Sequence, residues 1–417
     1  MSRMMEDPMA VASPLGIPLS RIGSGTAWVP DASPMYAIEG RVSSWTLMLQ
    51  GAAFGQYDDQ GSFRGDRQFG LIDSEMLMAL RPLAGGLLRF NVMTSFESFF
   101  VGERGYPELL QTGGAFDGAR LTNRQHPHDL LTELAADFEH SITSKLATSI
   151  YVAAAGEPAL GPVSYGNRPS AEDDPFAPLG HHWEDAAHGS DGVVTLGVYT
   201  RALKLEGSAF NGREPDDYRF NLDYTGARLD SYSGRVTAAP NANLTMSAWA
   251  GYVYGHDRLD DPTGMQRYGA SILTVRNRPN GGAWTNGIVW GMNIHHHSAR
   301  FHSHEPGAKT YTASAALLLE SSIDLNPRTS VYGRIEQVQK TADDLGFLGG
   351  EPMQLFTIRA LSLGATRELH AWSSLSVGFG ARGTLNFLPE TLRFTYDART
   401  PVGGSIFLRV RPVRMAH

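Results

Sequence analysis

The chain has 417 residues, which is enough for two or three ordinary domains or for one large barrel. Its 35 Lys and Arg against 43 Asp and Glu give a net charge of −8, which argues against a nucleic-acid partner, because such a protein needs a basic surface. The chain has no Cys, which excludes disulfides, thiolate metal sites and a Cys nucleophile. No run of about 18 apolar residues occurs, so we expect no membrane-spanning helix.

The first 40 residues are rich in Pro, Gly, Ser and Met and show no clear hydrophobic period. So many turn-forming residues argue against a regular element. We therefore interpret residues 1–40 as an N-terminal tail or plug-like segment, and we assign residues 41–417 to the main domain.

From residue 41 onward, apolar and polar residues alternate with the period of two that is typical of strands. The stretch WTNGIVWGMNIHHH shows this best, because Trp284, Ile288 and Trp290 share one face and Thr285 lies on the other. We expect the chain to leave the sheet at the three histidines that end it. The predicted strands, about sixteen in all, cover residues 45–56, 70–80, 87–99, 129–140, 145–154, 192–200, 203–210, 228–239, 244–255, 265–275, 283–294, 309–323, 329–340, 353–367, 374–387 and 401–412.

Long loops, such as residues 100–128 and 155–190, take turns along this series with short turns such as PNAN at 240–243. An up-and-down barrel threaded through a membrane has this pattern, with short periplasmic turns and long extracellular loops. A soluble sandwich is the alternative, but it has no reason to place every long loop at one end. We therefore predict an all-β, transmembrane, up-and-down antiparallel β-barrel of about 16 strands.

Several strands carry charged residues on the face opposite the apolar one; Lys204 and Glu206, for example, alternate with Leu203 and Leu205. A charge at the lipid midplane costs about 2–4 kcal/mol for Arg or Lys, so these residues should point into a water-filled lumen. On a soluble sheet they would simply be exposed. The predicted lumen-lining residues are Lys204, Glu206, Arg235, Arg334, Glu336, Arg382 and Arg409.

The stretch DLLTELAADFEH at residues 129–140 fits two structures. As a strand, it places Glu133, Asp137 and Glu139 on one face. As a helix, it has an Asp N-cap and an apolar stripe. We prefer the strand, because the even strand count requires it.

A first histidine motif, NRQHPHD, precedes this strand. His126, His128 and Asp129 could put two imidazoles and a carboxylate near one metal ion. Pro127 stiffens the link between the two histidines. The alternative is a loop whose histidines bond to backbone carbonyls and brace a folded-in loop.

A second motif, PFAPLGHHWED at residues 175–185, lies in the longest loop, where His181 and His182 are followed by His188. Loops this long are usually functional or folded into the barrel. We expect the two motifs to lie at the same rim, where they could meet over the lumen as a constriction or a metal site. The alternative is a loop core of Phe176, Leu179 and Trp183 with histidines at its edge.

A third group comprises His295, His296 and His297 in a predicted loop at 295–308. Histidine tracts bind transition metals weakly and adaptably, although an exposed tract need not have a physiological role. The three groups together suggest a divalent transition metal, Cu or Zn, as the one candidate cofactor.

The sequence offers no support for enzymatic activity, and we predict that the protein is not an enzyme. GFGARG at residues 378–383 matches GxGxxG, but that motif works only where a strand turns into a helix, and here a strand pattern continues. We find no P-loop, no HExxH and no nucleophile elbow.

The stretches NRQHPHDL, APLGHHWEDAAH, FNGREPDD, LDSYSGRVTAAP and RTPVGGSIFLRVRP resemble a family of Gram-negative outer-membrane, porin-like β-barrel proteins. The resemblance covers most of the chain from about residue 17 onward. It implies an outer-membrane location and a porin-like barrel. The chain departs from the common barrel ending, where an aromatic residue closes the last strand, because VRMAH follows Pro412.

The first functional hypothesis is therefore an outer-membrane barrel that passes small polar solutes or ions and is linked to metal handling through its histidines. Its surroundings would be outer-membrane lipid and lipopolysaccharide. The second is a barrel plugged by its long loops, with a binding or structural role at the cell surface. The third, ranked below both, is a soluble all-β binding protein.

Overall fold

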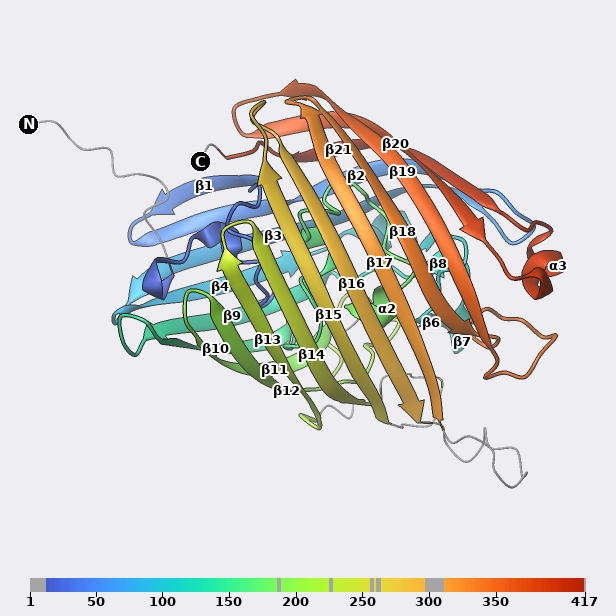
Figure 1. The fold of residues 1–417 in the computed structure, drawn as a ribbon, viewed down its shortest axis with the longest axis horizontal. Helices are drawn as coiled ribbons and strands as arrows, with labels where there is room; N and C mark the ends of the chain where they lie inside the picture. Colours follow the sequence, from blue (N-terminus) through green and yellow to red (C-terminus); the bar gives the residue numbers. More distant parts are fainter. Residues whose placement is uncertain are drawn as a thin grey trace, which may run out of the picture.

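The computed structural model describes residues 13–185, 189–224, 228–255, 259, 264–296 and 311–415. Across these residues, sixteen strands form one closed antiparallel barrel, in which each strand pairs with the next along the chain (Figure 1). The barrel closes where β21 pairs with β2. The predicted all-β, up-and-down barrel is confirmed.

The barrel strands, in their order around the wall, are β2 (Trp45–Gln60), β3 (Arg67–Leu83), β4 (Gly86–Thr94), β9 (Leu131–Ser141), β10 (Ala147–Gly156), β11 (Ser190–Tyr199), β12 (Leu203–Phe210), β13 (Ser231–Asn241), β14 (Leu244–Tyr254), β15 (Gly264–Asn277), β16 (Ala283–His296), β17 (Tyr311–Asn326), β18 (Thr329–Thr341), β19 (Leu355–Ala371), β20 (Leu375–Phe387) and β21 (Val402–Pro412).

Two long connections lie at the loop end of the barrel. L2 joins β4 to β9 over residues 95–130. L3 joins β10 to β11, and its described residues are 157–185 and 189. L2 contains α1 (Glu97–Phe100) and two short two-stranded sheets, and L3 contains η4 (Tyr165–Asn167) and α2 (His181–Glu184). The two sheets are β5 (Tyr106–Pro107) with β8 (Arg124–Gln125) and β6 (Gly114–Phe116) with β7 (Ala119–Leu121).

The remaining short elements lie near the two ends of the chain. The N-terminal segment, residues 13–36, holds η2 (Pro14–Gly16) and η3 (Leu19–Arg21), whereas η6 (Glu390–Leu392) and α3 (Arg393–Tyr396) follow β20. None of the helices in the described part of the chain is long and apolar enough to cross a membrane.

A short strand that the sequence did not predict, β1 (Ala37–Val42), completes the wall beside β2. It pairs with the first half of β2, whereas β21 pairs with the second half of the same edge. An isolated bridge between Tyr36 and Arg414 joins the two ends of the chain. The strand has only six residues and follows a segment rich in Pro and Gly. It is too short to show a clear alternation of apolar and polar residues, so the sequence did not predict it.

The two faces of the wall follow the prediction. On β16, Trp284, Ile288 and Trp290 are exposed on the outside, whereas Thr285 and Val289 on the opposite face are buried. The outer surface therefore carries apolar side chains, as a barrel in lipid requires, whereas the side chains of the inner face are covered.

The structure decides three points about the predicted strands. β4 ends at Thr94, five residues before the predicted end, because the carboxylate of Asp73 accepts the amide of Phe96 at 2.8 Å and so takes that N–H out of the ladder. Residues 131–141 form a strand rather than the alternative helix. β16 continues through His296, which pairs with Tyr311, so the chain does not leave the sheet at the first histidine.

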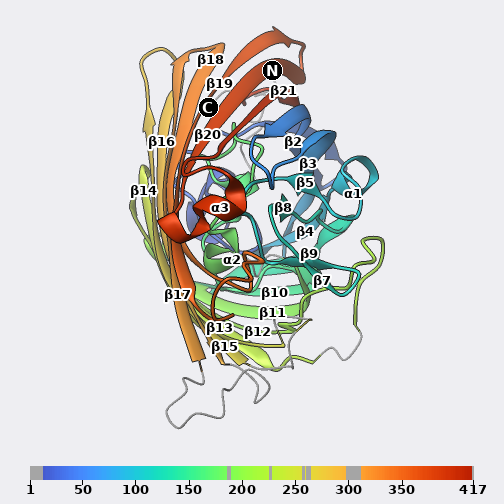
Figure 2. The same ribbon diagram turned by 90° about the vertical axis from the view of Figure 1, so that its right-hand side faces the viewer.

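The interior of the barrel is occupied by chain rather than left open. Figure 2, which looks on to the loop end, shows α2 of L3 inside the ring of strands. A Cβ on Gly291 of β16 would lie 2.1 Å from the Trp183 carbonyl oxygen, so only glycine lets α2 approach the wall so closely. Arg267 and Asn293 also donate to the His182 carbonyl oxygen at 3.2 and 3.1 Å.

The N-terminal segment also lies in the lumen. Arg89 of β4 donates to the Gly25 carbonyl oxygen at 3.3 Å, and Lys204 of β12 donates to the Thr26 carbonyl oxygen at 2.7 Å. Arg235 of β13 donates to the Thr26 hydroxyl at 2.9 Å. Three strands of the wall thus hold two consecutive residues of this segment.

Candidate functional site

The candidate site is the part of the lumen where L3 meets the wall. L3 carries three consecutive acidic residues, Glu172, Asp173 and Asp174, and the facing strands β18, β20 and β21 carry arginines. The ion pairs are Asp174 with Arg334 at 3.6 Å and with Arg382 at 3.2 Å, Asp173 with Arg409 and with Arg411 at 3.6 Å, and Glu172 with Arg411 at 3.8 Å. L3 is therefore tied to this side of the wall by charge.

The protonation of these acids follows from their surroundings. Burial raises the pKa of Asp173, but the charges of Arg409 and Arg411 outweigh burial and hold that pKa below its usual value. For Glu172 burial prevails over the attraction of Arg411 and raises the pKa to about 8. The arginines thus stabilise the charge of Asp173 more strongly than that of Glu172.

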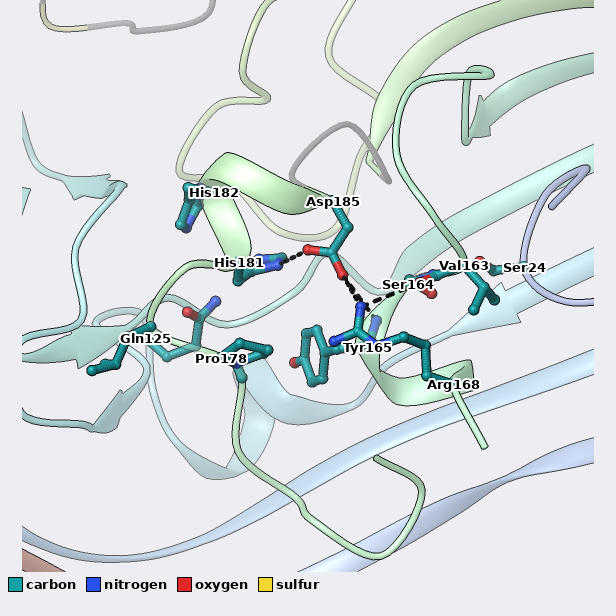
Figure 3. A network of polar contacts seen from close by, with 12 residues as sticks. Ser24, Gln125, Val163, Ser164, Tyr165, Arg168, Pro178, His181, His182 and Asp185 are labelled. Atoms are coloured by element: carbon teal, nitrogen blue, oxygen red, sulfur yellow. Dashed lines mark hydrogen bonds and ion pairs between the residues drawn. The ribbon is translucent and has the colours of Figure 1, made fainter. Parts of the chain in front are cut away.

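A second tie runs from L3 to β17 through a buried arginine, Arg168. Its Nε donates to Glu320 at 2.7 Å. Its Nη1 donates at 3.1 Å to Asp185, which also binds His181 (Figure 3). Ser170 donates to the same Glu320 carboxylate at 2.7 Å. Because Asp185 also accepts the amide of Tyr165 at 3.0 Å, the carboxylate fixes the fold of L3 itself.

The two predicted histidine motifs meet beside this network. The rings of His181 and His182 lie 4.6 Å apart, His126 lies 5.5 Å from His182, and His128 lies 6.2 Å from His126, all measured between ring centroids. The His126 and His182 rings thus bring L2 and L3 together at one rim, where the sequence suggested that the two motifs could meet. The packing alternative also describes the site, because Phe176, Leu179 and Trp183 are buried. The sequence placed both motifs in long loops at the same rim and left open whether they meet.

Carboxylates orient two of the imidazoles. His128 Nδ1 lies 2.9 Å from Glu97, and His181 Nδ1 lies 2.5 Å from Asp185. Carboxylates often orient metal-binding histidines in this way. Burial holds the pKa of His126 well below its ordinary value, which keeps that ring in the neutral form that metals bind.

The described residues nevertheless contain no group of three or more His, Asp or Glu arranged to hold a metal ion. Asp129, predicted as a ligand with His126 and His128, pairs with Arg219 at 3.1 Å. His295 and His296 lie in β16, and the His296 ring contacts Tyr311. His188 and His297 fall outside the described residues. Metal binding stays a prediction.

All seven predicted lumen residues lie on the inner face, with exposures between 1% and 8%. They are covered because each contacts the N-terminal segment or L3. Glu206 pairs with Lys204 and Arg235, which both reach Thr26, and Glu336 accepts the amide of Leu179 at 2.7 Å. The sequence predicted their direction. It missed their partners, although the acidic triplet opposite arginine-bearing strands was a visible signal.

An internal cavity of about 180 Å³ remains between L3, the N-terminal segment and the wall formed by β2, β3, β4 and β9. Its lining includes Glu172 and Asp174 of L3, so the cavity borders the charged contact described above. It is space that L3 and the N-terminal segment leave unfilled in the lumen.

No protein-family model matches the chain, and no curated protein matches it. Solved structures with a similar fold include OmpF of Salmonella typhi in complex with daunomycin, at 12% identity and a TM-score of 0.53, with 90% of this chain and 100% of that chain covered. An anion-selective porin from Comamonas acidovorans gives 10% identity and a TM-score of 0.53, with 88% and 100% covered. At these identities, the likeness concerns the fold, which is that of outer-membrane porins, as the resemblance implied. The link to the quoted motifs stays a prediction.

Proposed function

We propose that the protein lies in the outer membrane as a porin-like conduit for small polar solutes or ions. The proposal depends on one observation. L3 lies inside the closed barrel, and its acidic residues pair with arginines of the inner wall. A charged constriction of this kind selects solutes by size and charge. The role is passive, so the proposal includes no enzymatic step.

The outer surface supports the location. Side chains such as Trp290, Leu317, Ile335 and Leu363 are 38–64% exposed on the outside of the wall. Apolar area on this scale needs a lipid surrounding, whereas the charged inner face needs water or protein. We therefore infer contact with outer-membrane lipid and with lipopolysaccharide.

The contacts of the N-terminal segment favour the second candidate, a plugged barrel with a binding or structural role. Arg89, Lys204 and Arg235 bond to Gly25 and Thr26 rather than facing open water. Conductance in planar lipid bilayers separates the two candidates. The purified protein should give discrete current steps in KCl if it is a conduit, and a silent membrane would instead support the plugged barrel.

Metal handling is a subordinate part of the proposal. It is supported by the four imidazoles that meet between L2 and L3 and by the carboxylates that orient His128 and His181. Because His181 already binds Asp185 and His128 binds Glu97, a Cu or Zn ion would use the opposite ring nitrogens, and the loops would have to move to bring three of them together.

A further inference from the structure

The charge of the internal cavity is one-sided. Its acidic lining residues are Asp73, Glu97, Glu133, Glu157, Glu172 and Asp174. Its basic lining residues are Arg411 and His128. Arg411 lies 3.2 Å from Glu368 and 3.6 Å from Asp173, and His128 binds Glu97, so both bases already have anionic partners. A solute in this cavity therefore meets more acidic than basic side chains.

One of these carboxylates, that of Glu133, has an oxygen without a partner. Glu133 is 2% exposed, and its Oε2 has no hydrogen-bond partner among the described residues, whereas its other oxygen accepts the Tyr151 hydroxyl. Asp73 is 4% exposed and is already engaged, by the amide of Phe96 and by the side chain of Glu75. A buried carboxylate oxygen without a partner is costly, so a positively charged donor in the cavity would be stabilised there.

Part of the remaining lining is apolar. Met35 of the N-terminal segment, Phe54 of β2, Ile72 of β3 and Met93 of β4 line the same space. A bare, strongly hydrated metal ion gains nothing from such side chains, whereas a short alkyl group does. The combination of carboxylates and apolar side chains is therefore suited to a cation that carries a small apolar body.

We propose that this cavity binds small organic cations, with an ammonium group at Glu133 and an apolar body against Met93, its cross-strand neighbour, and Met35. The proposal rests on the proposed function, because it names the class of solute that the conduit accepts. Burial raises the pKa of Glu157 and of Glu172 to about 8, and a bound cation would favour the ionised form of both.

Hexylammonium and hexanoate give a direct test, because they share one alkyl chain and carry opposite charges. Titration calorimetry on the full chain in detergent should show binding of hexylammonium and none of hexanoate. In bilayers, hexylammonium should also reduce the current steps more than hexanoate does. Equal binding of the two ions, or no binding of either, would overturn the cation site.

The double variant Asp73→Asn, Glu133→Gln places the test at the cavity. We expect hexylammonium to bind roughly tenfold to a hundredfold more weakly, which is the range for losing charged hydrogen bonds. Glu390→Gln, at an exposed residue after β20, is the matched control and should bind as the wild type does. Unchanged affinity in the double variant would also overturn the site.

The two readouts separate this inference from the proposed function. Current steps without a preference for hexylammonium leave the conduit standing and remove the cation site. A silent membrane removes the conduit, and calorimetry then decides whether a plugged barrel binds the cation. If the double variant does not fold, the comparison of hexylammonium with hexanoate on the wild type still decides.

Discussion

Arg409 of β21 forms an ion pair with Asp173 of L3, a residue 236 positions earlier in the chain. Both side chains are almost completely buried, at 1% and 3% exposure. The pair joins the last strand of the barrel to the loop that fills it. Breaking one member of a buried pair leaves the other charged and without its partner, which is far more costly than removing both.

We therefore expect Arg409→Gln to lower the free energy of unfolding by about 3 kcal/mol, at the low end for a broken buried pair because Arg411 remains near Asp173. L3 should also loosen, so single-channel conductance should rise. Denaturant unfolding in detergent and bilayer recordings measure the two effects. Arg399→Gln, at an exposed arginine, is the control and should change neither. A variant as stable as the wild type would show that the pair does not hold L3.

The N-terminal segment gives a second prediction. Deletion of residues 2–33 leaves β1 intact but removes Gly25 and Thr26, the partners of Arg89, Lys204 and Arg235. The lumen should widen, so we expect larger current steps from the deleted chain than from the full chain in the same KCl solution. Equal step sizes would mean that this segment does not obstruct the path. Circular dichroism before recording checks that the deleted chain still forms the barrel.

The periodic part of the fold was predictable from sequence, and the contents of the barrel were not. β12 (Leu203–Phe210) was predicted to the residue, because apolar and charged residues alternate without interruption between two turns. The predicted end of β4 was wrong, because the strand ends where Asp73 of β3 accepts the Phe96 amide. The tie between Arg168 and Glu320 spans 152 positions and leaves no local pattern in either segment. The histidine motifs are an intermediate case. The alternation of long loops and short turns placed both motifs at one rim, but it did not predict which rings come into contact.

Gly291 offers a test of how closely L3 lies against the wall. A Cβ at this position would lie 2.1 Å from the Trp183 carbonyl oxygen, so Gly291→Ala must push α2 away from β16. We expect a loss of about 1–3 kcal/mol in the free energy of unfolding, as for overpacking elsewhere. Gly383→Ala in β20 is the control, because nothing lies within 4 Å of its Cβ position. If both variants unfold at the same denaturant concentration, L3 does not contact the wall here.

The histidines at the contact between L2 and L3 give a fourth prediction. If these rings bind a divalent ion after the loops adjust, calorimetry with Zn²⁺ or Cu²⁺ should show a binding signal that disappears in the triple variant His126→Ala, His128→Ala, His181→Ala. A control variant, His370→Ala in β19, should keep the signal, because that ring contacts Trp372 instead. Binding that survives in the triple variant would assign the metal to other residues.

The last prediction concerns pH. Burial raises the pKa of Glu157 to about 8, and the negative charge of Glu133 adds to this rise, whereas the hydrogen bond from Ser24 and the charge of Arg235 oppose it. A Glu in an unfolded chain titrates near ~4.3, so between about pH 4 and pH 8 the folded protein binds more protons than the unfolded one. The free energy of unfolding must then fall as the pH rises through this window, and this contribution becomes constant above it. Glu157→Gln removes the titration, so its unfolding temperature in detergent should fall less between pH 5 and pH 8 than that of the wild type. The exposed-site variant Glu390→Gln should keep the wild-type slope, and equal slopes in all three proteins would contradict the assignment to Glu157.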